Sequence, residues 1–220
     1  MKIIRCILFN VVRTILRVIA FFLFPRKLIH KERIPKKSKF VAVANHQHWA
    51  DAVYLYIKGP GRVYMLAKKE LQEKSRFLRV MRKSAGITFI DRENPSVSSI
   101  KSILGILKSD RPILVFPEGT RNKESNELME TKPGAAMFAI KARAPMIPMM
   151  VYERARAFRM NYVYVGEPFE FSEFYGQKLT EELLEEANAK MRAHMLTEMG
   201  NMREYVANKR RKKKAPPAGE

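Results

Sequence analysis

The chain has 220 residues, and 46% of them are hydrophobic, which is enough for a folded core and too much for disorder throughout. Its 42 lysines and arginines against 22 aspartates and glutamates give a formal net charge of +20, which predicts a polyanionic partner or surface, either nucleic acid or anionic lipid. The single cysteine, Cys6, excludes an intrachain disulfide and a zinc site built from several thiolates.

The first 24 residues are mostly apolar but carry Arg5, Arg13 and Arg17. At about 100° per residue, these arginines and Lys2 fall on one side of a helix, and the apolar side chains fall on the other. A bilayer-spanning helix is disfavoured because a central arginine there costs about 3 kcal/mol. We therefore expect an N-terminal amphipathic membrane-binding helix that lies in the bilayer interface and ends near Pro25. Packing of this helix on the protein's own core is the alternative.

From residue 40 onward, short apolar runs alternate with helical segments. The runs indicate strands, and their residues are 40–44, 63–67, 87–90, 113–116, 146–151 and 162–165. Helices are expected between them, at residues 51–57, 69–84, 96–109 and 134–143. This alternation predicts an α/β fold, with a mainly parallel or mixed sheet covered by helices. Ligands of such sheets bind beyond the carboxyl ends of the strands.

The C-terminal part has a different composition. Residues 180–201 are charged and contain methionine and leucine at helical spacing, so we expect a helix that covers the domain. Residues 209–214 are six consecutive cations, whose mutual repulsion favours disorder. We expect four regions in the whole chain, namely an N-terminal membrane-associating segment at 1–30, an α/β domain at 31–175, a C-terminal helical cover at 176–207 and a basic disordered tail at 208–220.

The string NHQHWAD follows the first predicted strand and places His46 five residues before Asp51. Neither a helix nor a strand brings side chains at this spacing together, but a turn from a strand into a helix can. A carboxylate bonded to one imidazole nitrogen fixes the tautomer and stabilises the cation that forms when the other nitrogen takes a proton. The pair could therefore activate a hydroxyl group. The alternatives are that both residues only brace the turn, or that they bind a metal together with His48.

Two further strings, GITFIDR and FPEGTR, also follow predicted strands. Arg92 and Arg121 offer planar guanidinium groups suited to phosphate oxygens, and Gly119 allows a positive φ or a close backbone approach. The alternative is that Asp91–Arg92 and Glu118–Arg121 are local ion pairs, which contribute little. A fourth string, APMIPM, carries no catalytic side chain and reads as an apolar wall.

Together and in this order, the four strings resemble the glycerolipid acyltransferase family, of the 1-acylglycerol-3-phosphate acyltransferase type. The resemblance covers residues 40–152. It implies that His46 is the general base and that Asp51 orients it. It further implies that the glycerol-phosphate site contains Arg92, Glu118, Gly119, Thr120, Arg121 and Lys132. The chain departs from the family where Thr131 replaces a frequent aromatic residue. It also departs between Leu71 and Gly86, where the segment SRFLRVMRKSA lacks a frequent proline and glycine.

The resemblance implies transfer of a fatty acyl group from acyl-CoA or acyl carrier protein to the free hydroxyl of lysophosphatidic acid, which gives phosphatidic acid in phospholipid biosynthesis. We expect no metal or organic cofactor, and attachment to the cytoplasmic side of the cell membrane as a monotopic or peripheral protein. Glycerol 3-phosphate or another lysophospholipid is an alternative acceptor. A basic nucleic-acid-binding protein and a non-catalytic lipid-binding relative are the remaining alternatives. The first leaves the four strings unexplained, and the second leaves the intact His46–Asp51 pair unexplained.

Overall fold

A computed structural model describes residues 22–58, 63–68, 87–91 and 95–214, together with Val11, Thr14, Val18 and Ile19. In this part of the chain, seven strands form one sheet in the order β1-β7-β6-β2-β5-β3-β4. The strands are β1 (Arg26–Ile29), β2 (Val41–Val43), β3 (Tyr64–Lys68), β4 (Ile87–Ile90), β5 (Ile113–Val115), β6 (Met146–Val151) and β7 (Asn161–Val165). All neighbouring pairs are parallel except β6 and β7, so the expected mixed sheet is confirmed.

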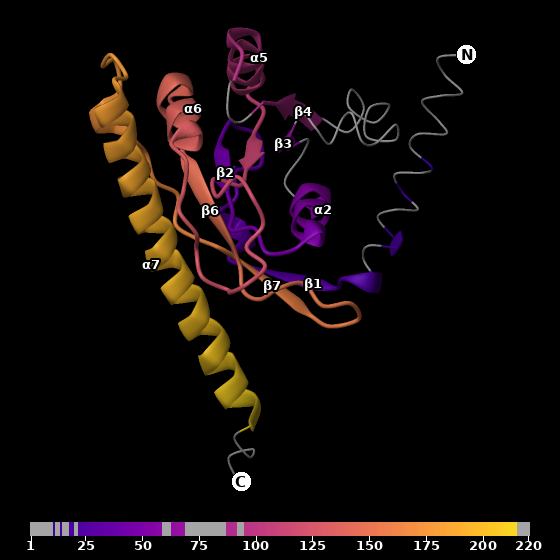
Figure 1. Cartoon of the computed structure of the whole chain (residues 1–220). Helices are drawn as coiled ribbons and strands as arrows, with labels where there is room; N and C mark the ends of the chain where they lie inside the picture. Colours follow the sequence, from indigo (N-terminus) through magenta and orange to yellow (C-terminus); the bar gives the residue numbers. More distant parts are fainter. Residues whose placement is uncertain are drawn as a thin grey trace.

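Helices cover both faces of the sheet (Figure 1). The helices α5 (Val97–Lys108), α6 (Gly134–Ala142) and α7 (Glu181–Lys214) pack on one face, and α2 (Trp49–Lys58) packs on the other. Short 3-10 helices lie at Lys31–Arg33 and Ser172–Phe174. Side chains alternate along β2, so Val41 and Val43 enter the core beneath α5 to α7 while Ala42 enters the core beneath α2. The apolar character of this strand therefore reflects burial on both of its faces.

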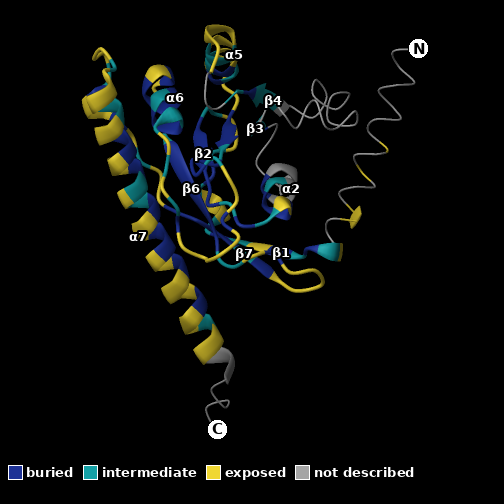
Figure 2. Ribbon diagram, viewed as in Figure 1, coloured by how far each residue is buried: buried dark blue, intermediate teal, exposed yellow. Residues whose placement is uncertain are grey.

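The helix α7 is held on the sheet by a row of buried apolar side chains. Their spacing of three or four residues matches one face of a helix, and each is at most 2% exposed; they are Met191, Met195, Met199, Met202 and Val206. Figure 2 shows buried residues along one side of α7 and exposed residues along the other. Thr180 precedes the helix, and its hydroxyl accepts a hydrogen bond from the backbone N–H of Leu183 at 3.3 Å, as a helix cap does.

The basic segment at residues 209–214 is helical, which corrects the disorder that the sequence predicts for it. The helix α7 continues through this segment to Lys214. Lysine and arginine are good helix formers, and the preceding turns are anchored by Val206. Aromatic rings also offset the repulsion, because Lys209 lies 5.4 Å from the ring centroid of Tyr162 and Arg210 lies 5.2 Å from that of Tyr152. Residues 215–220 lie outside the described part.

The remaining expectations on secondary structure have mixed outcomes. All six predicted strands are confirmed within two residues at each end, and so are the helices that became α2, α5 and α6. The strand β1 was missed. The helix predicted at residues 69–84 lies outside the described residues. Near the N-terminus the described residues are helical, and Val18 and Phe22 are 50% and 67% exposed. No helix among the described residues combines the length and the apolar character needed to cross a bilayer.

The packing of α7 predicts unequal effects of two adjacent truncations. Met195→Ala should lower the free energy of unfolding by about 2–5 kcal/mol, because it leaves a cavity in the core. Leu196→Ala, at the neighbouring position that is 39% exposed, should cost less than about 1 kcal/mol. Urea unfolding followed by circular dichroism measures both changes. Equal losses would contradict this packing of α7.

Candidate active site

Three loops meet at one edge of the sheet, where the parallel strands β2, β5 and β6 end. The first loop begins at Asn45, whose buried side chain bridges to the end of β6. Its amide nitrogen donates to the carbonyl oxygen of Val151 at 3.0 Å, and its amide oxygen accepts from the Val151 N–H at 2.7 Å. The sequence analysis gave Asn45 no role. Its position directly after a buried strand could have indicated this role, because a buried polar side chain must find hydrogen-bond partners.

His46 and Asp51 come together across the turn between β2 and α2, as the sequence predicted. His46 Nδ1 lies 3.2 Å from Asp51 Oδ2. The same carboxylate oxygen accepts hydrogen bonds from the backbone N–H groups of Gln47 and His48, both at 2.7 Å. Asp51 therefore braces the turn and orients the imidazole at the same time. Because a carboxylate only accepts hydrogen bonds, the Nδ1 atom of His46 carries the proton and Nε2 keeps a lone pair.

His48 lies in the same turn but in a different setting. Its Nδ1 accepts a hydrogen bond from the backbone N–H of Ala50 at 3.3 Å, so this nitrogen helps to cap α2. Burial lowers the pKa of His48 below its usual 6.5. Asp51 acts in the opposite direction, while Arg154 and Arg121 add to the lowering. Within the described part of the chain, no three histidine, cysteine or acidic side chains gather as a metal site would require.

Glu118 holds the turn that carries His46 from the loop after the neighbouring strand β5. Its Oε1 accepts from the backbone N–H of His46 at 2.6 Å, and its Oε2 accepts from the N–H of Met129 at 3.1 Å. The residue is only 5% exposed, and this burial raises the pKa of its carboxyl group, although both hydrogen bonds oppose the change. Both oxygens thus bind backbone groups, and among the described residues Glu118 and Arg121 form no ion pair with each other.

The other predicted phosphate-site residues lie on and after this loop. Gly119 has a φ of +71°, as its glycine predicted, and a Cβ atom there would lie 3.5 Å from Cε of Lys132. The backbone N–H of Lys132 donates to the carbonyl oxygen of Pro117 at 2.9 Å, which joins the two segments. Thr120 and Arg121 are exposed. Arg92 lies outside the described residues.

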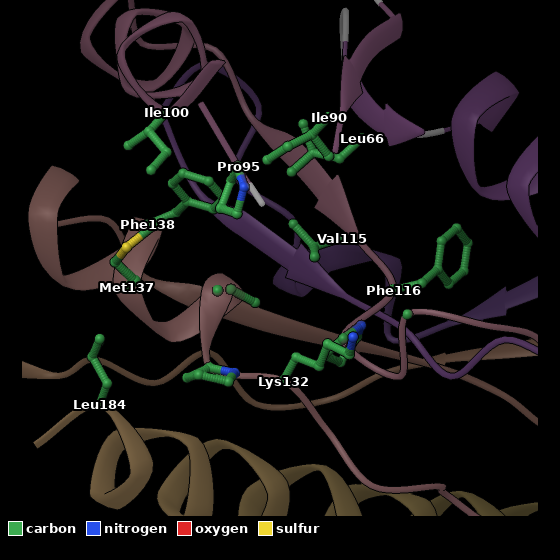
Figure 3. A pocket seen from close by; sticks show the side chains of 15 residues that line it. Leu66, Ile90, Pro95, Ile100, Val115, Phe116, Lys132, Met137, Phe138 and Leu184 are labelled. Atoms are coloured by element: carbon green, nitrogen blue, oxygen red, sulfur yellow. The ribbon is translucent and has the colours of Figure 1, made fainter. Parts of the chain in front are cut away.

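An apolar cavity of about 310 Å³ adjoins these residues (Figure 3). Its walls come from β3 to β5, α5, α6 and the start of α7, and they include Leu66, Ile90, Ile100, Val115, Met137, Phe138 and Leu184. Lys132 is the one charged side chain among the described residues that line it. Phe116 connects the cavity to the turn that carries His46. Its side chain lines the cavity and stacks on the His46 ring, with ring centroids 4.1 Å apart. The sequence gave no direct signal of this cavity, since its walls are brought together only by the fold.

Comparison with known proteins identifies the class of this arrangement. A family model described as Acyltransferase matches residues 25–152. The chain is 35% identical over 123 residues to the 1-acyl-sn-glycerol-3-phosphate acyltransferase of Bacillus subtilis, with 56% of this chain and 60% of the relative covered. The enzyme of that name from Streptococcus pneumoniae is 37% identical over 121 residues, with 54% and 44% covered. The human alpha enzyme is 33% identical, with 53% and 42% covered.

The chain thus spans between about two fifths and three fifths of the length of these relatives. Among solved structures, the 1-acyl-sn-glycerophosphate (LPA) acyltransferase of Thermotoga maritima has a similar fold, with a TM-score of 0.61. That similarity covers 82% of this chain and 75% of the other at 22% sequence identity, so it speaks for the fold alone.

The burial of Glu118 predicts a pH-dependent difference in stability between the wild type and Glu118→Gln. The raised pKa means that the folded protein binds this proton more tightly than the unfolded chain does. The contribution of the Glu118 proton to the free energy of unfolding is therefore fully present below pH 4.5, the usual pKa of a glutamate. It is lost as the pH rises through the raised pKa of the folded protein. Glu118→Gln has no proton to lose there, so the wild type should lose stability relative to the variant over this range.

Urea unfolding of both proteins at a series of pH values, starting below 4.5, measures this difference. A difference that stays constant across the series would contradict the raised pKa.

Proposed function

This chain belongs to the acyltransferase family, and we propose that it transfers a fatty acyl group from an acyl thioester to the free hydroxyl of 1-acylglycerol 3-phosphate. The product is phosphatidic acid, a step of phospholipid biosynthesis. This proposal rests on one observation. His46 is hydrogen-bonded to Asp51 at 3.2 Å and stacks on Phe116, and Phe116 also lines the apolar cavity. A base thus lies beside a space suited to a hydrocarbon chain.

The chemistry follows from the tautomer that Asp51 imposes on His46. As the acceptor oxygen attacks the thioester carbonyl carbon, its proton passes to Nε2 of His46, and Asp51 stabilises the resulting imidazolium. The carbon–sulfur bond then breaks, and His46 returns the proton to the departing sulfur, which leaves a new ester and a free thiol. The transfer is direct, so it needs no covalent enzyme intermediate, metal or organic cofactor.

The acceptor phosphate is placed by cations and backbone at the edge of the cavity. Lys132 lies against Gly119 at the cavity wall, and Arg121 follows on the same loop. Arg92 and Thr120 complete the set that the resemblance implies. We assign Glu118 a different task, because a buried carboxylate bound to two backbone N–H groups is poorly suited to an anionic phosphate. It positions the backbone of His46.

The partners follow from the substrates. The donor is acyl-CoA or acyl carrier protein, and the acceptor is a lipid that resides in a bilayer, so the chain must work at a membrane surface. We place it on the cytoplasmic side of the cell membrane as a monotopic or peripheral protein, held by its N-terminal segment. The net charge of +20 is complementary to an anionic leaflet, and nucleic acid is not required to explain it.

Removing the proposed base tests the mechanism. His46→Ala should lower kcat by about 10²–10⁴, the usual contribution of a positioned general base, with the fold retained. His48→Ala, two residues away, should cause a far smaller loss, because its Nδ1 is engaged in capping α2. Acyl transfer from labelled acyl-CoA to lysophosphatidic acid measures both, and near-normal turnover by His46→Ala would overturn the mechanism.

A second test addresses recognition of the phosphate by Arg121. Arg121→Lys keeps the charge but loses the planar fork, and hydrogen bonds to charged groups are worth about 1.5–3 kcal/mol. We therefore expect kcat/KM for lysophosphatidic acid to fall about 10- to 100-fold, with no matching change for unphosphorylated monoacylglycerol. Arg203→Lys, on the exposed side of α7, is the matched control and should change neither value. Equal losses with the two acceptors would show that Arg121 is structural.

A further inference from the structure

The loop between β6 and β7, residues 152–160, exposes an unusual mixture of side chains. Phe158 is 75% exposed and Met160 is 52% exposed, and both stand among arginines. In Figure 1 the loop projects beside β1, and in Figure 2 most of it is exposed. A lone exposed apolar residue needs no explanation, but large apolar side chains beside cations are typical of surfaces that enter a lipid interface.

The arginines of this loop surround a small polar cavity of about 140 Å³. Arg154, Arg156, Arg159 and Arg210 contribute four positive charges to its wall, against one negative charge from Glu153. Arg210 and Glu153 lie 3.5 Å apart and are both partly exposed, so this contact is weak. In the part of the chain that the structure describes, none of the three loop arginines forms an ion pair. The cavity therefore suits an anion.

The loop has a fixed backbone that holds these side chains outward. The buried side chain of Asn161 accepts from the N–H of Arg156 at 3.0 Å and donates to the carbonyl oxygen of Arg159 at 2.8 Å. Phe158 has a φ of +58°, a conformation that bulky residues rarely adopt and that collects at functional positions. These backbone bonds do not involve the exposed side chains, so substitution of those side chains leaves the frame intact.

The loop lies next to other exposed apolar groups and next to the catalytic turn. The N–H of Phe158 donates to the carbonyl oxygen of Leu23 at 2.6 Å, beside Phe22, which is 67% exposed. Phe24 follows and packs edge-on against Trp49, which is 51% exposed. The loop itself starts directly after Val151, which is bonded to Asn45, the neighbour of His46.

We propose that the β6–β7 loop is a membrane-docking element, in which Phe158 and Met160 insert into an anionic bilayer while Arg154, Arg156 and Arg159 bind lipid headgroup phosphates. The inference rests on the proposed function in one respect, since an enzyme that acts on a bilayer lipid must bring its catalytic edge to the bilayer. The arginines make the loop prefer anionic lipid. The apolar side chains add a contribution to the binding free energy that salt does not screen. An RNA partner would use the arginines but would leave Met160 without a purpose.

Two double variants of the full chain separate these contributions. Phe158→Ser with Met160→Ser removes the apolar part, and Leu196→Ser on α7 is its control. Arg156→Gln with Arg159→Gln removes two charges, and Lys108→Gln with Lys141→Gln is the control with the same change in charge. Both control lysines are exposed, and they lie in the last turns of α5 and α6. These turns lead into the starts of β5 and β6, at the end of the sheet opposite to the β6–β7 loop. Co-sedimentation uses phosphatidylcholine vesicles with and without phosphatidylglycerol.

We expect the apolar variant to bind both kinds of vesicle roughly 10- to 100-fold more weakly at low and at high salt. The arginine variant should bind anionic vesicles about 25-fold more weakly at low salt, at roughly 5-fold for each cation, and little changed at high salt. The controls should bind like the wild type. Wild-type binding by both loop variants would overturn the proposal. So would an arginine variant that keeps vesicle binding and instead loses binding to an RNA homopolymer.

Acyl transfer distinguishes this proposal from the proposed function. With a water-soluble short-chain acceptor, the loop variants should keep wild-type turnover, and with acceptor presented in anionic vesicles they should lose activity in step with vesicle binding. Loss of turnover on the soluble acceptor would overturn the docking role in favour of a catalytic one. If the wild type transfers no acyl group to either acceptor, the proposed function fails, while the vesicle measurements still decide on the loop.

Discussion

The turn that carries His46 depends on the hydrogen bonds of the Asp51 carboxylate. A fully buried carboxylate requires hydrogen bonds to compensate for lost hydration, and this one receives N–H groups from His46, Gln47 and His48. The two backbone donors lie in the turn directly before α2, so the same bonds that close the turn also fix the imidazole. Folding of the turn and orientation of the His46 imidazole are therefore one event. This explains how a spacing of five residues, which fits neither a helix nor a strand, brings the pair together.

The turn is held from its other sides by the neighbouring strands. Glu118, from the loop after β5, binds the backbone N–H of His46, and the carbonyl oxygen of His46 accepts the N–H of Asn122 at 2.7 Å. Asn45 ties the end of β2 to Val151 at the end of β6. These contacts exist because β2, β5 and β6 are parallel, so that their carboxyl ends share one edge of the sheet. The parallel arrangement of these strands thus supplies the surrounding hydrogen bonds that hold a functional side chain in place.

The sequence predicted what depends on local patterns and missed what depends on tertiary contacts. Buried strands and the His46–Asp51 pair were recognisable because their residues lie close together along the chain. The strand β1 was missed, because Arg26–Ile29 holds only two apolar residues and its pairing with β7 spans more than a hundred positions. The end of α7 was misjudged, since charge repulsion was weighed without the core contacts of Val206. The hydrogen bonds of Glu118 to the backbone of His46 and Met129 could not be predicted either, because sequence does not reveal which way a carboxylate points.

The long helix α7 runs from the apolar cavity to the β6–β7 loop. Near its start, Leu184 lines the apolar cavity, and near its end, Arg210 lies over the ring of Tyr152 at the base of the β6–β7 loop. These two residues are about 39 Å apart along the helix axis at 1.5 Å per residue. The buried methionine row packs the helix on the sheet between these two residues, so the cavity, the loop and His46 belong to one packed unit. A surface that held the loop would therefore also set the orientation of the edge that carries His46.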